Sequence, residues 1–108
     1  MNNTDPTGWG TLLQLAGDLI EEYNLQPIAV RVQSAGFPER GLRAEVQVSW
    51  HALRGIWERL PKGARTVVTR KNAMRHVSVE LDAGLWLFAV GEQAGSKATE
   101  GPRAAVTL

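Results

Sequence analysis

The sequence contains no cysteine among its 108 residues. This absence excludes disulfide bonds, zinc sites with thiolate ligands and cysteine nucleophiles. It also suits a reducing compartment, and we expect the protein to be cytoplasmic. No stretch approaches the roughly 18 apolar residues that a membrane-spanning helix requires, and the first residues lack the basic and apolar regions of a secretory signal. We therefore expect a soluble chain that does not contact membranes.

Side chains suited to catalysis are scarce. The only two histidines, His51 and His76, match no HxxxH or HxH spacing of a metal site. His76, Ser78 and Glu80 would share one face of a strand, but side chains at i and i+2 stand about 7 Å apart, too far for a direct proton relay. No glycine-rich stretch joins a strand to a helix, as phosphate cradling requires. We predict no catalytic residue, no cofactor and no metal, and hence a protein that is not an enzyme.

Each sign of charge is missing from one part of the chain. The first 30 residues contain four acidic side chains and no lysine or arginine. Residues 59–79 contain six lysine or arginine side chains and no acidic one. This segregation is more informative than the net charge of +1, because local fields rather than totals attract a charged partner.

Two helices are predicted from apolar residues that recur every three or four positions. The first begins between residues 6 and 12 and ends at Asn24 and Pro27, and the second follows a Ser49 cap and stops at Pro61. The expected buried stripe of the first helix consists of Trp9, Leu12, Leu13, Ala16, Leu19, Ile20 and Tyr23.

Period-two alternation predicts five strands. They cover approximately residues 28–33, 43–50, 64–70, 76–82 and 85–90, and the first two form an antiparallel hairpin. The resulting order, α-β-β-α-β-β-β, predicts an α+β fold in which an antiparallel sheet of about five strands packs on two helices. We expect residues 1–92 to form this domain. Residues 93–108, rich in Gly, Ala, Ser and Thr, are predicted to be a flexible tail that folding does not need.

Two surfaces are candidates for binding. In the strand from Leu85 to Val90, Trp86 and Phe88 share one face, and they would form an aromatic patch if that face met solvent. The second candidate is the basic hairpin, which we define as Arg70, Lys71 and Arg75 around a turn. It could be a solvated tip, bind an acidic protein or bind nucleic acid, although no aromatic residue lies nearby to stack on bases.

The stretches "LLQLAGDLIEEYNLQPIAVRVQ", "AEVQVSWHALRGIWERL" and "RHVSVELDAGLWLFAVGE" follow one another in a recognisable succession. This succession resembles small uncharacterised proteins of actinobacterial phages and integrative mobile elements. The resemblance implies a setting in which small proteins bind host or defence proteins, and it transfers no site residues.

Our hypothesis from the sequence is a non-catalytic interaction module that binds and modulates, for example inhibits, a host or defence protein. The alternative is a nucleic-acid-binding accessory protein that acts through the basic segment 59–79. Pairing into a homodimer stays open.

Overall fold

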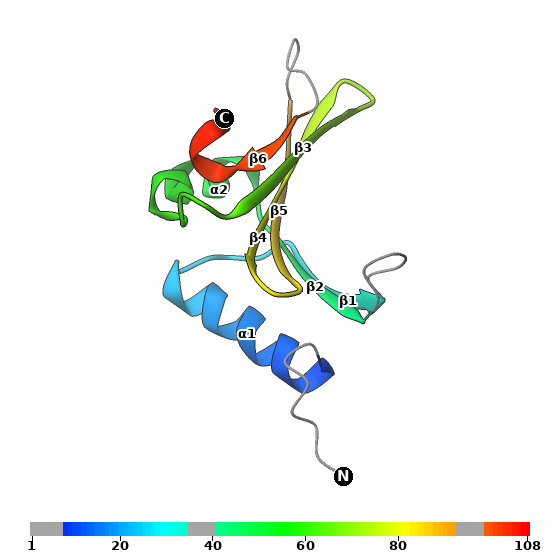
Figure 1. Ribbon diagram of the computed structural model, residues 1–108. Coiled ribbons are helices and arrows are strands. Elements are labelled where there is room, and N and C mark those ends of the chain that lie inside the picture. Colours follow the sequence, from blue (N-terminus) through cyan, green and yellow to red (C-terminus); the bar gives the residue numbers. More distant parts are fainter. Residues whose placement is uncertain (1–7, 35–40, 93–98) are drawn as a thin grey trace.

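The computed structural model describes residues 8–34, 41–92 and 99–108 (Figure 1). Two helices pack on one face of a six-stranded sheet whose strand order is β1-β2-β5-β4-β3-β6. The elements are α1 (Trp9–Glu22), β1 (Ala29–Ser34), β2 (Leu42–Gln47), α2 (Trp50–Ile56), η1 (Trp57–Arg59), β3 (Arg65–Lys71), β4 (Met74–Asp82), β5 (Leu85–Glu92), β6 (Thr99–Pro102) and η2 (Arg103–Ala105). The α+β class with two helices is confirmed.

The sheet is mixed, whereas an antiparallel sheet was predicted. After β2 the chain passes through α2, and the β3–β4–β5 meander then brings β5 back beside β2 in the parallel direction. The parallel pairing runs from Ala44 opposite Leu85 to Gln47 opposite Phe88. The remaining neighbouring strands pair antiparallel, including the predicted β1–β2 hairpin. The turn expected between β1 and β2 lies mostly outside the described residues.

Residues 99–108 differ from the flexible tail that their composition suggests. Thr99–Pro102 forms a sixth strand, β6, which pairs antiparallel with β3. The side chains of Arg103 and Val106 are 4% and 8% exposed, so both lie against the body of the protein. The backbone N–H of Arg103 also donates to the carbonyl of Ala64 at 2.8 Å. Residues 93–98 lie outside the described part of the chain.

The first helix starts within its predicted range but buries less than its pattern predicts. It begins at Trp9 after Gly8, without a side-chain cap. Leu12, Ala16 and Leu19 are buried, but Trp9 and Leu13 are 57% and 52% exposed. The predicted stripe was therefore too wide at the start of the helix, whereas Ile20 and Tyr23 are partly buried against the core. The helix ends just before Asn24, as predicted, and Asn24 has a left-handed φ of 52°.

Ser49 caps α2 as its sequence predicts. Its Oγ accepts a hydrogen bond from the backbone N–H of Ala52 at 3.0 Å. The helix then tightens into the 3₁₀ turn η1, and Leu53, Ile56, Trp57 and Leu60 are buried as expected. In the described part of the chain, no helix is both long and apolar enough to cross a membrane.

The hydrophobic core lies between the helices and one face of the sheet. It draws Leu12, Ala16 and Leu19 from α1, with Leu53 and Ile56 from α2. The strand residues that reach it are Ala44, Val46, Val68, Val77, Val79, Leu85, Leu87 and Ala89. Since side chains alternate along a strand, every intervening residue points to the opposite face. We call this opposite side the open face, because no described helix packs on it.

Candidate functional site

Trp86 occupies the middle of the open face. It lies on β5, between Glu45 on β2 and Glu80 on β4 in the strand register. The side chain is nevertheless only 3% exposed. Two guanidinium groups cover it, because Cζ of Arg43 lies 4.2 Å and Cζ of Arg65 lies 5.5 Å from its ring centroid. A guanidinium held over an indole at such distances is a cation–π contact.

Carboxylates hold these arginines in place. Arg43 pairs with Glu45 at 3.3 Å, and Arg65 pairs with Glu100 at 2.9 Å. Glu45 also forms an ion pair with Arg31 at 3.4 Å, so one carboxylate orients two arginines from neighbouring strands. Pairs this close to solvent contribute little to stability. Their effect is to fix the position of the guanidinium groups around Trp86.

Phe88 shares the open face with Trp86, as the alternation predicts. It is partly exposed, and its ring lies 5.7 Å from the ring of His76 on β4. Beside Trp86 is a hollow of about 230 Å³. Its lining is formed by Arg43, Arg65, Val67, Ser78, Trp86 and Glu100. The predicted aromatic pair is therefore present on one face, but Trp86 lies beneath arginines instead of meeting solvent.

His76, Ser78 and Glu80 follow one another along the open face of β4, as predicted. Their cross-strand neighbours on β5 are Val90, Phe88 and Trp86, which offer no acid, base or nucleophile. Glu80 accepts a hydrogen bond from the backbone N–H of Gly84 at 3.4 Å. Within residues 8–34, 41–92 and 99–108, no three histidine, aspartate or glutamate side chains come together as a metal site.

The basic hairpin is only partly exposed. Arg70 and Lys71 are exposed at the end of β3, next to a turn in which Asn72 and Ala73 have positive φ. Arg75 lies opposite Arg70 in the register, yet it is only 7% exposed. Its guanidinium donates to the carbonyl of Thr107 and lies 5.8 Å from the ring of Trp50. Arg75 is therefore held by residues that are distant in sequence, and it is not part of an exposed basic tip.

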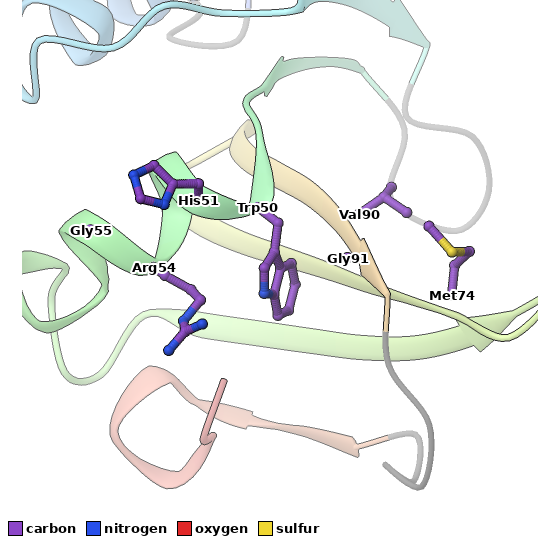
Figure 2. Close-up of a pocket in the computed structure, with 7 residues that line it drawn as sticks. All are labelled: Trp50, His51, Arg54, Gly55, Met74, Val90 and Gly91. Atoms are coloured by element: carbon purple, nitrogen blue, oxygen red, sulfur yellow. The ribbon is translucent and has the colours of Figure 1, made fainter.

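A pocket of about 880 Å³ lies beside α2 (Figure 2). Its lining is formed by Trp50, His51, Arg54, Gly55, Met74, Val90 and Gly91. Trp50 and Arg54 extend to the same side of α2, whereas His51 points away from them. No pattern in the sequence predicts this pocket, because Trp50 continues the alternation of β2 and the close approach of its ring to Gly91 is a tertiary contact.

The acidic helix α1 and the exposed cations of the β3–β4 turn lie far apart. The exposed cations Arg70 and Lys71 lie at the β3–β4 turn, at the opposite end of the molecule from α1 (Figure 1). Asp18 and Glu22 of α1 instead line a hollow of about 190 Å³ together with Asp82 of β4.

Tyr23 lies beside the acidic end of the molecule. Burial raises the pKa of the Tyr23 hydroxyl above its ordinary value, and the nearby Glu22 raises it further. The Arg59 guanidinium, 5.0 Å from the tyrosine ring, acts in the opposite direction and lowers that pKa. Because burial is the largest of these effects, the net change is upward.

Comparison of the chain with protein-family models, with curated proteins and with solved structures finds no match.

Proposed function

We propose that the protein is a non-catalytic interaction module that binds another protein through the open face of its sheet. The observation that carries this proposal is the covered tryptophan at the centre of that face. Trp86 lies beneath Arg43 and Arg65, and each arginine is held by a carboxylate. Arginine and tryptophan are the residue types most often found at the energetic centre of protein interfaces.

Pre-organisation makes this arrangement suitable for binding. A free arginine loses side-chain entropy when a partner immobilises it, and this loss reduces affinity. Arg43 and Arg65 are already oriented before binding, because the indole supports them and Glu45 or Glu100 pairs with them. The hollow beside them, with Val67 in its lining, offers a recess for one side chain of the partner.

The mixed charge of the open face favours a protein over a nucleic acid. Glu45, Glu80 and Glu100 lie among its arginines. The phosphates of a nucleic acid would lie close to these carboxylates and be repelled by them. Nucleic-acid binding depends on lysine and arginine side chains whose charge is not already neutralised by such carboxylates. Alternating charges around an apolar centre are instead typical of a protein interface, where they select the correct partner.

The resemblance to small phage and mobile-element proteins suggests the class of partner. A module of this kind would bind a host or defence protein and modulate its activity. Binding would then need no catalytic group in the module, because occupying the partner's surface is sufficient to inhibit it.

Two charge reversals on the same strand test the proposal. Arg65→Glu alters the open face, whereas the matched control Arg70→Glu alters the exposed end of β3. The protein is used to capture its partner from a host lysate, and the affinity for the purified partner is then measured by calorimetry. We expect Arg65→Glu to weaken binding at least tenfold, or about 1.4 kcal/mol, and Arg70→Glu to leave it nearly unchanged.

The same experiment can contradict the proposal. If both variants have native circular dichroism and only Arg70→Glu loses the partner, the basic hairpin and not the open face is the binding surface. Trp86 is unsuitable as the first variant, because truncating a buried tryptophan costs about 3–5 kcal/mol of stability.

A second candidate function is nucleic-acid binding through the basic segment 59–79. The observation in its favour is that Arg59, Lys62, Arg70 and Lys71 are all exposed. Fluorescence anisotropy of labelled DNA and RNA at increasing salt tests it, because phosphate binding weakens steeply as salt rises. A steep salt dependence that becomes shallower in Lys71→Glu would support this function.

A further inference from the structure

The two edges of the sheet differ in how they are protected from pairing. At one edge, β6 is only four residues long and contains Gly101 and Pro102, which disfavour the addition of another strand. At the other edge, β1 has six residues, AVRVQS, with neither glycine nor proline. An unprotected edge strand is a template for pairing with a further strand.

Hydrogen bonding within the sheet defines which backbone groups of β1 point away from β2. The N–H groups of Ala44 and Val48 donate to carbonyls of Gly84 and Phe88, so even-numbered residues of β2 direct their backbone towards β5. Odd-numbered residues of β2 therefore face β1, where they meet Ala29, Arg31 and Gln33 in the register. Since these groups alternate along a strand, the backbone N–H and C=O groups of Val30 and Val32 point outward from the sheet.

Exposed apolar side chains gather beside this edge. Val30 is 41% exposed, and Ile28, just before β1, is 63% exposed. The other large apolar side chains with high exposure in the described residues are Trp9 and Leu13 of α1, the helix that packs on β1 and β2. Single exposed apolar residues are common on proteins, but their occurrence on an edge strand and on the helix that adjoins it favours an interaction surface.

We infer that β1 pairs antiparallel with β1 of a second copy of this chain, around a twofold axis that places Val30 opposite Val30. Residues of β1 whose backbone groups point outward must pair with residues of the same kind in the second copy, so only a few registers between the two strands are possible. In this one, Val32 lies opposite Ile28 of the second copy, which brings two further apolar side chains together. The backbone N–H of Ile28 already donates to the carbonyl of Gln47 at 2.7 Å, so it adds no hydrogen bond to this pairing.

Charge on the open face favours this register over its neighbour. Here Arg31 lies opposite Ala29 of the second copy. A shift that placed Val30 opposite Val32 would instead bring Arg31 opposite Arg31, and like charges directly across a strand pair are destabilising. A twofold axis also makes the surface complementary to itself, which is the usual arrangement of a homodimer.

Sedimentation of the full chain tests the dimer. We expect the wild-type protein to be mainly dimeric at about 100 µM, which requires a Kd well below that concentration. Val30→Pro removes an outward N–H and spares the β1–β2 hydrogen bonds, and Val30→Lys places a charge in the interface. Both variants should raise Kd at least tenfold, whereas the control Thr69→Lys, on an exposed residue of β3, should not. A monomeric wild type, or a Val30→Lys variant that still dimerises normally, overturns the proposal.

Disulfide formation tests the register, because the natural chain contains no cysteine. Residues directly opposite each other in a hydrogen-bonded antiparallel pair have Cα atoms about 5.5 Å apart, within the range that a disulfide spans. Val30→Cys should therefore oxidise rapidly to a covalent dimer. The matched variant Val32→Cys should oxidise much more slowly, and faster oxidation of Val32→Cys than of Val30→Cys overturns the proposed axis.

This inference is independent of the open-face proposal. Arg65→Glu should leave the sedimentation of the protein unchanged, so a failure of the dimer and a failure of partner binding at the open face are distinguishable.

Discussion

Adding one methyl group at Gly91 should destabilise the protein through Trp50. Gly91 lies on β5, and the indole of Trp50 packs directly over it. A Cβ built on Gly91 would lie 2.2 Å from Cδ2 of Trp50, 2.6 Å from Cε3 and 2.7 Å from Cε2. Ordinary van der Waals contact begins at 3.4 Å, so Gly91→Ala forces the ring to move by more than an ångström.

The size of the effect follows from the surroundings of the indole. Inserting a methyl group into a packed site costs about 1–3 kcal/mol, because side chains and backbone must shift. The pocket beside α2 allows some movement of the ring, but the Arg75 guanidinium lies 5.8 Å from the Trp50 ring and restricts it. We therefore expect a loss of about 2 kcal/mol, which lowers the melting temperature of a chain of this size by about 10 °C.

A double-mutant cycle separates the ring contact from effects on the backbone. Trp50→Ala removes the obstructing indole, so Gly91→Ala should become nearly neutral in that background, with a coupling energy of about 2 kcal/mol. Urea unfolding should be followed by far-ultraviolet circular dichroism, because Trp50→Ala changes the fluorescence signal. An equal cost of Gly91→Ala with and without Trp50 would refute the argument and assign the cost to the backbone.

Two further predictions concern the C-terminal segment and the single tyrosine. Truncation after Gln93 should lower the melting temperature by several degrees or more, because it removes β6 and the buried Val106. An unchanged melting temperature would instead show that folding does not need this segment, as its composition predicts. The absorbance of tyrosinate should report a Tyr23 pKa higher in the folded than in the unfolded protein. Arg59→Ala should raise this pKa further and Glu22→Gln should lower it.

The raised pKa of Tyr23 determines whether the protein becomes more or less stable at alkaline pH. The folded state holds the Tyr23 proton more tightly than the unfolded state, whose pKa is about 10. The free energy of unfolding should therefore decrease as the pH rises from about 10 through the folded-state pKa. A Tyr23→Phe variant, which cannot ionise, should lack this component, and an identical alkaline profile for both proteins would contradict the assignment.

Local patterns predicted the elements that depend on local interactions. The cap at Ser49, the end of α1 before Asn24 and the β1–β2 hairpin each need only a few neighbouring residues, and all three are present. The parallel pairing of β2 with β5 was not predictable, because it depends on how the β3–β4–β5 meander packs back on the sheet. The strand β6 was missed because backbone hydrogen bonds, and not a hydrophobic period, place it beside β3.

The sequence predicted which face of the sheet carries the candidate site, but not that arginines cover its tryptophan. Alternation along β5 correctly placed Trp86 and Phe88 together on the face away from Leu87. The exposure of Trp86 depends on Arg43 and Arg65, which lie on strands distant in sequence and reach the indole only in the folded sheet. The burial of Arg75 likewise depends on the C-terminal segment.

The strand order also explains why arginines cover the tryptophan. β5 is apolar on both faces and lies in the interior of the sheet, between β2 and β4. The helices cover one of its faces, and no described helix covers the other, so long side chains of the adjoining strands shield Trp86. Arginine is suited to this role, because its aliphatic stem and planar guanidinium can lie on apolar surface while its polar edge meets solvent. Replacing Arg43 would therefore expose the indole and alter the proposed binding surface at once. Arg65, 46% exposed at its side chain, is for this reason the better position at which to separate binding from folding.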